Sequence, residues 1–311
     1  MSIHTSLVAG GAGFLGSHLC EKLLSQNIKV ICVDNLFTGS INNIKHLFDN
    51  KNFSFIHHDI ILPLDINCDD IYNLASPASP IYYQKDPIYT TKVNVIGSLN
   101  LLNLALKLDI KILQASTSEV YGDPLIHPQN ESYFGNVNPI GPRSCYDEGK
   151  RCAESLFFDF HRKFSLNIKI VRIFNTFGPR MQPHDGRVIS NFINQALFNK
   201  DITIYGSGTQ SRSFCYVDDL IDAIILMMKS NDNITGPINI GNPDEFSMIG
   251  IAKKIISMTN SSSIISYSSL PEDDPKLRKP DIVKAMQYLN WHPKISIDDG
   301  LINTINFFKN L

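Results

Sequence analysis

A phenol and an ammonium group stand four residues apart in the segment Tyr146-Asp-Glu-Gly-Lys150. Residues at this spacing lie on the same face of a helix, so the two side chains are neighbours if the segment is helical. A nearby ammonium group favours the phenolate and therefore lowers the pKa of a phenol. The pair predicts that Tyr146 acts as a base near neutral pH, with Lys150 beside it.

A second polar cluster, Ser116-Thr117-Ser118-Glu119, directly follows the apolar segment 110–115, which is typical of a buried strand. Parallel sheets of this kind bind ligands beyond the carboxyl ends of their strands. One of these hydroxyl groups could hold a substrate alcohol while Tyr146 removes the proton of that alcohol and a nicotinamide takes the hydride. Considered alone, Glu119 is better explained as a solvated carboxylate at the end of a strand.

The glycine-rich segment GGAGFLG, residues 10–16, lies between an expected strand and an expected helix. Its glycines would let the backbone approach a pyrophosphate, which the helix N-terminus would face. Asp34 ends the next expected strand, where a carboxylate accepts a hydrogen bond from a ribose 2′-hydroxyl and repels a 2′-phosphate. Residues 35–39 contain no arginine, so the sequence predicts NAD rather than NADP; the alternative is a glycine-rich turn without a ligand.

Composition excludes several classes of protein. The 311 residues are 43% hydrophobic, and Lys+Arg 28 against Asp+Glu 30 leaves a net charge of −2, which gives no basic surface for nucleic acid or an anionic membrane. No apolar run is long enough for a membrane span, and no signal peptide is evident, so we expect a cytoplasmic protein. The six cysteines lack a C-x-x-C motif, which favours free thiols in a reducing compartment.

Two further features could suggest other chemistry. His57-His58-Asp59 resembles a metal site faintly, but no further ligands stand at suitable spacing, so no metal is predicted. Cys145 precedes Tyr146 in the sequence, and no histidine is placed to activate it, which favours a packed thiol over a nucleophile.

The order of apolar segments predicts an α/β fold of the Rossmann type, a doubly wound parallel sheet with a smaller C-terminal α/β domain that binds the substrate. We expect residues 1–173 to form the NAD-binding domain, with 212–241 returning to it, and residues 174–311 to form most of the second domain. Strands are expected at 3–9, 28–33, 53–56, 71–74, 110–115, 168–173, 202–205, 214–217 and 237–240. Helices are expected at 14–25, 87–108, 144–164, 188–199, 218–229, 247–259 and 297–311, and a loop around a short strand at 260–269.

Seven segments of the sequence resemble a known family over nearly the whole length of the chain. These are LASPASP (74–80), STSEVYGDP (116–124), HPQ-x-E (127–131), VNPIGPRSCYDEGKR (137–151), RIFNTFGPRM (172–181), DGRVISNFI (185–193) and RKPDI (278–282). They are similar to the UDP-glucuronate decarboxylases, or UDP-xylose synthases, of the extended short-chain dehydrogenase/reductase family.

The resemblance implies a reaction in three steps. A tightly bound NAD, regenerated in each cycle, oxidises UDP-glucuronate at carbon 4; the ketone, now β to the carboxylate, permits loss of carbon dioxide, and the returned hydride yields UDP-xylose. The alternatives are a UDP-sugar 4-epimerase, a 4,6-dehydratase, or a non-catalytic protein that binds NAD or a nucleotide sugar. Ser118 stands where the dehydratases have an Asp, and Glu119 stands where the 4-epimerases have no acid, which favours decarboxylation.

The resemblance also implies site residues. Thr117 and Tyr146 would contact the 4-hydroxyl, and Lys150 the nicotinamide ribose. Glu119 and Arg278 would lie near the leaving carboxylate, with Arg278 delivering a proton through water or orienting the group; from its charged surroundings alone, Arg278 would be placed in a solvated loop. The expected cofactor-binding residues are Gly10, Gly13, Phe14, Leu15, Asp34, Asn35, Phe37, Thr38, Gly39, Asp59, Ile60, Leu74, Ser76, Asn94, Tyr146, Lys150, Thr176 and Arg187. The expected substrate-binding residues are Lys92, Thr117, Asn175, Arg187, Asn191, Tyr205, Arg212 and Arg278.

The expected helices near 87–108 and 144–164 would, by the same resemblance, form a four-helix bundle in a homodimer. The apolar stripe Val95, Leu99, Leu102 and Leu106 predicts, by its spacing alone, a face packed against the sheet. Some of that stripe would then belong to the dimer interface.

Overall fold

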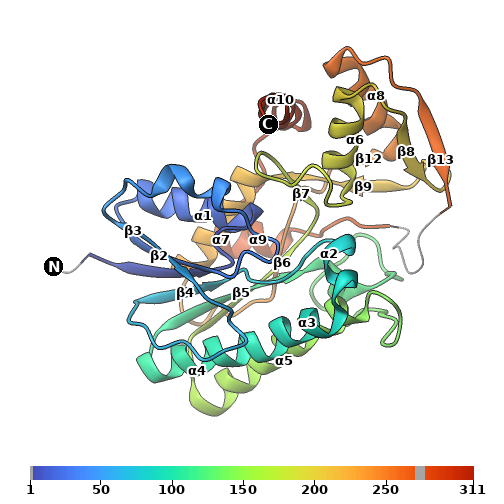
Figure 1. The fold of residues 1–311 in the computed structure, drawn as a ribbon. Coiled ribbons are helices and arrows are strands. Elements are labelled where there is room, and N and C mark those ends of the chain that lie inside the picture. Colours follow the sequence, from blue (N-terminus) through green and yellow to red (C-terminus); the bar gives the residue numbers. More distant parts are fainter. Residues whose placement is uncertain (1–2, 270–276) are drawn as a thin grey trace.

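A parallel sheet of seven strands forms the central layer of the computed structural model, which describes residues 3–269 and 277–311 (Figure 1). Its order is β11-β6-β5-β4-β1-β2-β3, the arrangement of a doubly wound dinucleotide-binding fold. The strands are β1 (Thr5–Ala9), β2 (Lys29–Asp34), β3 (Phe53–His57), β4 (Asp70–Asn73), β5 (Lys111–Thr117), β6 (Ile168–Ile173) and β11 (Ile238–Ile240). The predicted fold class is confirmed.

Helices cover both faces of this sheet (Figure 1). Successive side chains of a strand point to opposite faces, so Val8 of β1 packs into one hydrophobic core while Leu7 and Ala9 pack into the other. Burial on both faces explains why the strands are almost continuously apolar. One face carries α1 (Phe14–Ser25), α7 (Val217–Lys229) and α9 (Val283–Leu289), and the other carries α3 (Pro87–Lys92), α4 (Ser98–Leu108) and α5 (Ser144–Phe164).

The helix predicted for residues 87–108 is continuous but not uniform. A π-helical turn, η3 (Val93–Gly97), joins α3 to α4, and the backbone stays in the right-handed helical region at Val93 and Ser98. Such turns are rare and occur often at functional sites. A further helix, α2 (Pro80–Lys85), precedes α3 and was not predicted.

The other helices and strands form a smaller region beyond the carboxyl ends of the central strands (Figure 1). Its helices are α6 (Val188–Leu197), α8 (Met248–Thr259) and α10 (Ile297–Lys309). Three strand pairs accompany them: β8 (Ile202–Tyr205) with β13 (Ile265–Ser268), β9 (Ser211–Ser213) with β12 (Glu245–Ser247), and β7 (Thr176–Phe177) with β10 (Cys215–Tyr216). The strand expected at 214–217 is shorter because α7 already begins at Val217.

The chain crosses between these regions more than once. It leaves the central sheet after β6 and later returns, so that α7 packs against α1 and β11 extends the sheet beside β6. Within the described residues, no helix combines the length and apolar character needed to cross a bilayer. All six cysteines are free thiols, as predicted.

Candidate active site

The glycine-rich turn between β1 and α1 is packed too closely for side chains. Gly10 adopts a positive φ of 78°, and a Cβ there would lie 2.8 Å from the backbone of Ala75; at Gly16 it would lie 2.1 Å from the carbonyl oxygen of Gly10. Glycine is the residue that fits both conditions. No described side chain caps α1 at its N-cap, Gly13, so the first backbone N–H groups of the helix are open to an anion.

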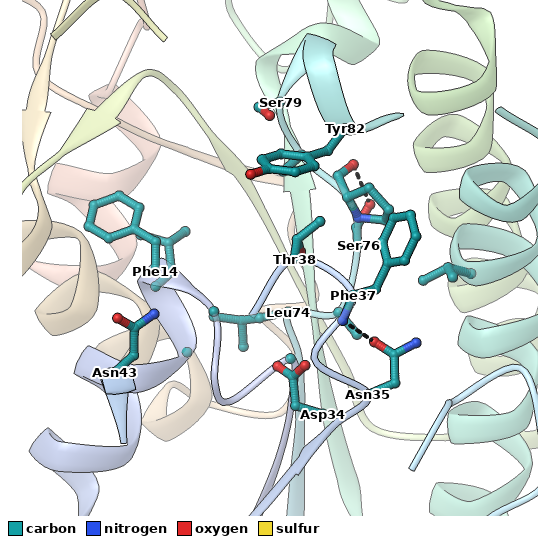
Figure 2. A pocket seen from close by; sticks show the side chains of 18 of the residues that line it. Phe14, Asp34, Asn35, Phe37, Thr38, Asn43, Leu74, Ser76, Ser79 and Tyr82 are labelled. Carbon is teal, nitrogen blue, oxygen red and sulfur yellow. Dashed lines mark hydrogen bonds between the residues drawn. The ribbon is translucent and has the colours of Figure 1, made fainter. Parts of the chain in front are cut away.

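This turn forms the floor of a cavity, here called the glycine-loop cavity, which Figure 2 shows from close by. Asp34, at the end of β2, lies on one wall, with Asn35 and Phe37 to one side and Phe14 to the other. The cavity wall includes these predicted cofactor-binding residues: Gly10, Gly13, Phe14, Leu15, Asp34, Asn35, Phe37, Thr38, Asp59, Ile60, Leu74, Ser76 and Arg187.

The Asp34 carboxylate is held in place by the backbone. Its two oxygens accept hydrogen bonds from the N–H groups of Ala12, at 3.0 Å, and Leu36, at 2.8 Å. Burial raises its pKa, and these two hydrogen bonds act in the opposite direction. Asp34 therefore faces the cavity as a fixed acceptor.

Asp59 belongs to a hydrogen-bonded group at the same end of the cavity. Its Oδ2 atom accepts hydrogen bonds from Asn35, at 2.9 Å, and from the hydroxyl of Tyr89, at 2.7 Å. The ring of Phe37 packs against Tyr89 with their centroids 4.9 Å apart. His57 contacts the carbonyl oxygen of Asn35, and the next two residues, His58 and Asp59, line the cavity.

A second cavity adjoins the first and is here called the tyrosine cavity. Phe14, Leu15, Leu74, Ser76 and Arg187 line both cavities, so the two are continuous. All five predicted catalytic residues line the tyrosine cavity: Thr117, Glu119, Tyr146, Lys150 and Arg278. It is also lined by Asn175, Thr176, Asn191, Tyr205 and Arg212.

Tyr146 and Lys150 lie on α5, as their spacing predicts, but the predicted effect on the phenol is wrong. Burial raises the pKa of Tyr146, against the lowering effect of a hydrogen bond with Thr117. Lys150 donates to the carbonyl oxygen of Ala115 at 2.9 Å, and its Nζ lies 5.9 Å from the centroid of the Tyr146 ring. Burial lowers the pKa of Lys150 to about 7, so at neutral pH it carries only part of its charge.

Glu119 is enclosed by two arginines. Arg278 donates from Nη1 to Oε1 of Glu119 at 2.5 Å and from Nη2 to Oε2 at 2.7 Å. Arg143 donates from Nη2 to the same Oε2 at 2.7 Å. Burial opposes the ionisation of Glu119, but the two guanidinium groups outweigh it and lower its pKa to about 2. Arg278 is only 7% exposed. The alternatives of a solvated carboxylate and a solvated arginine are therefore wrong.

Two residues at this site were missed. Arg143 lines the tyrosine cavity and stands one helical turn before Tyr146, so its place in the segment 137–151 was an available signal. Tyr83, on α2, stacks on Tyr146 with the rings inclined by 4° and their centroids 5.2 Å apart. Nothing in the sequence around Tyr83 indicates that contact.

Three predicted site residues do not lie on either cavity wall. Lys92 is exposed on α3. Asn94 is buried in the π-helical turn, donates to the carbonyl oxygen of Thr90 at 3.0 Å, and packs against α5 at Gly149. Gly39 packs against the Asp34 carboxylate, which a Cβ at this position would approach to 2.8 Å. Their binding roles stay predictions.

Cys145 is a packed thiol. Its Sγ donates to the carbonyl oxygen of Tyr83 at 3.5 Å, and burial raises its pKa. A thiol with a raised pKa forms little thiolate at neutral pH, which does not suit a nucleophile.

Comparisons with known proteins agree with this geometry. Residues 6–241 match the NAD dependent epimerase/dehydratase family. UDP-glucuronic acid decarboxylase 3 of Arabidopsis thaliana is 55% identical over 296 residues, which are 95% of this chain and 86% of that protein. UDP-glucuronic acid decarboxylase 1 of Xenopus tropicalis is 50% identical over 303 residues, 97% of this chain and 72% of that protein.

A solved structure shares the whole fold. The crystal structure of UDP-glucuronic acid 4-epimerase from Bacillus cereus in complex with UDP-glucuronic acid and NAD is similar with a TM-score of 0.88 and 30% identity. The similarity covers 98% of this chain and 99% of that chain.

Proposed function

We propose that the chain, which belongs to the NAD dependent epimerase/dehydratase family, is a carboxy-lyase that converts UDP-glucuronate to UDP-xylose with NAD. The observation that carries the proposal is the meeting of two groups in one cavity: Thr117, Tyr146 and Lys150 for oxidation of an alcohol, and Arg278 with Glu119 for a carboxylate. The decarboxylases that match the chain at 50–55% identity support the same reaction.

The glycine-loop cavity fits NAD. Its close-packed glycines and the uncapped N-terminus of α1 suit a pyrophosphate, and the fixed carboxylate of Asp34 suits a ribose 2′-hydroxyl. When bound, NAD accepts a hydride from carbon 4 of the sugar and later returns it. We also propose that NAD stays tightly bound and is regenerated in each catalytic cycle.

In the first step the chain's residues handle one proton. Thr117 and Tyr146 hold the 4-hydroxyl of the sugar, and Tyr146 takes its proton as the C4–H bond breaks. Because burial raises the pKa of Tyr146, the phenolate that accepts this proton must form after NAD and the sugar nucleotide have bound. Lys150, whose Nζ lies 5.9 Å from the ring centroid, stabilises the phenolate when it is protonated.

In the second step the carboxylate leaves as carbon dioxide. The electrons of the C5–C6 bond move toward the 4-keto oxygen, where Thr117 and Tyr146 donate hydrogen bonds that stabilise the developing negative charge. Arg278 orients the carboxylate through its planar fork. Because a guanidinium hardly deprotonates, carbon 5 takes its proton from water that Arg278 positions, and a proton from the solvent neutralises the hydroxide left behind. Tyr146 then returns its proton to oxygen 4 as the hydride comes back to carbon 4.

For the nucleotide, we propose Arg187, Arg212, Asn175, Asn191 and Tyr205 as the residues that hold UDP. All five line the tyrosine cavity on the side of the smaller region. Guanidinium groups suit phosphate oxygens. On this basis residues 1–173, with 212–241, form the NAD-binding domain, and residues 174–311 form most of the UDP-sugar-binding domain.

A 4-epimerase is the second candidate, since a UDP-glucuronic acid 4-epimerase shares the fold. One assay separates the candidates: incubation with UDP-glucuronate, followed by measurement of carbon dioxide and of the sugar nucleotide formed. A decarboxylase gives carbon dioxide and a UDP-pentose, a 4-epimerase retains the carboxylate, and a non-catalytic protein binds without turnover.

We propose a homodimer formed through α3–η3–α4 and α5. Ile88, Ile96 and Leu99 are exposed along the first of these helices, while Leu102 is buried in the core, so the apolar stripe is divided between two environments. Light scattering that gives the mass of a monomer would overturn this assembly. The six free thiols fit a reducing compartment, and we propose the cytoplasm.

A further inference from the structure

Glu119 is held by two arginines that come from different parts of the chain. Arg143 is the N-cap residue of α5, one turn before Tyr146. Arg278 lies far along the sequence and forms a β-bridge with Arg212, the central residue of β9. Arg278 contributes two hydrogen bonds to the carboxylate and Arg143 contributes one.

The proposed function gives Arg278 a second carboxylate to bind, on the Nη1/Nη2 edge of its fork that Glu119 already occupies. A planar guanidinium fork binds one carboxylate in the bidentate manner, and both Nη atoms of Arg278 already contact Glu119. If the substrate carboxylate is oriented by this same edge of the fork, Arg278 must exchange Glu119 for the substrate. A buried carboxylate that loses its partner is strongly destabilised, so the exchange needs a second cation for Glu119.

We infer that Arg143 is the positioning residue that keeps Glu119 ionised and in place while Arg278 turns to the substrate carboxylate. This inference rests on the proposed function and adds to it a residue that acts through Glu119. Arg143 is suited to the task because it is 7% exposed, lines the tyrosine cavity and starts the helix that carries Tyr146 and Lys150. Its contact therefore fixes Glu119 relative to the groups that oxidise carbon 4.

The two chemical steps depend on Arg143 to different degrees. Oxidation at carbon 4 uses Thr117, Tyr146 and Lys150, whereas loss of carbon dioxide uses Arg278 after the exchange. Without Arg143, Arg278 stays on Glu119, so carbon dioxide release slows more than oxidation. Glu119 also loses one of the cations that favour its ionised form, so the acidic limb of the pH profile moves to higher pH.

The test compares Arg143→Met and Arg143→Lys with a control on the same helix. Arg162→Met is the control, because Arg162 forms an exposed ion pair with Asp159 near the end of α5. In each holoenzyme, single turnover of UDP-glucuronate is followed by absorbance of NADH and by carbon dioxide release, and kcat is measured across acidic and neutral pH. Thermal unfolding reports whether each variant is folded.

Arg143→Met is expected to lower the rate constant of carbon dioxide release at least ~10-fold. NADH should accumulate in this variant, and the acidic limb of its profile should move up. Arg143→Lys should recover part of the rate because it restores the charge without the fork, and Arg162→Met should behave as the wild type.

Several results would overturn the inference. Equal loss of NADH formation and carbon dioxide release, with an unmoved pH limb, would show a merely structural role, and an unchanged Arg143→Met would show no role. If Arg143→Met does not fold, the Lys variant decides the matter by the same two signals. A wild-type protein that releases no carbon dioxide would instead refute the proposed function.

Discussion

The ring of Tyr83 lies parallel to the ring of Tyr146, at an angle of 4° and a centroid separation of 5.2 Å. Tyr83 comes from α2 and Tyr146 from α5, so the contact joins two helices that the sequence separates widely. The stacked ring shields the Tyr146 phenol from water and contributes to the burial that raises its pKa. The helix that precedes α3 is thus part of the catalytic environment.

Replacement of Tyr83 tests this contact. Tyr83→Ala should cost about 3–5 kcal/mol of folding stability because it leaves a cavity, and it should lower kcat by freeing Tyr146. Among the described residues, the Tyr83 hydroxyl has no hydrogen-bond partner. Tyr83→Phe should therefore keep the kcat of the wild type, and its free energy of unfolding should change by no more than ~1 kcal/mol. Denaturant unfolding and steady-state kinetics measure both effects; equal kcat in the Ala variant would show that the stacking is dispensable.

Asp34 should determine the choice of dinucleotide. The wild type is expected to bind NAD more tightly than NADP, because the carboxylate repels a 2′-phosphate. Asp34→Asn should reduce that preference at least ~10-fold, or about 1.4 kcal/mol, by removing the negative charge. Calorimetric titration of the wild type and of Asp34→Asn, each with NAD and with NADP, gives the four dissociation constants. A wild type that prefers NADP would contradict the assignment.

Glu119 should contribute to stability in a way that depends on pH. Its pKa is about 2 in the folded protein, below the ordinary value of 4.5, so the stabilisation is present above pH 4.5 and is lost as the pH falls through 2. Glu119→Gln should destabilise the protein by about 3–5 kcal/mol at neutral pH, because two buried guanidinium groups lose the negative charge that they share.

Glu119→Gln and Arg278→Lys should also lower the rate of decarboxylation. Glu148→Gln is a matched control, since Glu148 forms a partly exposed ion pair with Arg151 on α5. Unfolding curves and carbon dioxide release are measured for all three variants. Full decarboxylation by both site variants would refute the role given to this ion pair.

Asp147 should reduce stability as the pH rises. Burial, together with the charge of Glu119, raises the pKa of Asp147 to about 8 from the ordinary 3.8. Between these values the folded state binds more protons than the unfolded state, so stability falls as the pH increases from about 4 to 8. Asp147→Asn should flatten this slope, and Tm measured against pH reports it; parallel slopes for the two proteins would show that Asp147 titrates normally.

The sequence predicted helices and strands well where the hydrophobic periodicity of the segment itself specifies them. The expected bounds of α1, α5, β6 and β8 are those observed, because long apolar repeats with turn residues at their ends specify these elements. The Arg143–Glu119 contact and the stacking of Tyr83 depend on how distant segments pack, which periodicity does not encode. The pKa of Tyr146 was mispredicted for the same reason, since spacing shows that Lys150 is near but not that both groups are buried.

The most direct test of the account is incubation of the purified protein with UDP-glucuronate labelled at carbon 6. The account predicts that the label leaves as carbon dioxide, one molecule for each UDP-xylose formed, with no net change in NAD. A product that keeps the label, such as a 4-epimer of UDP-glucuronate, or tight binding with no turnover would contradict it.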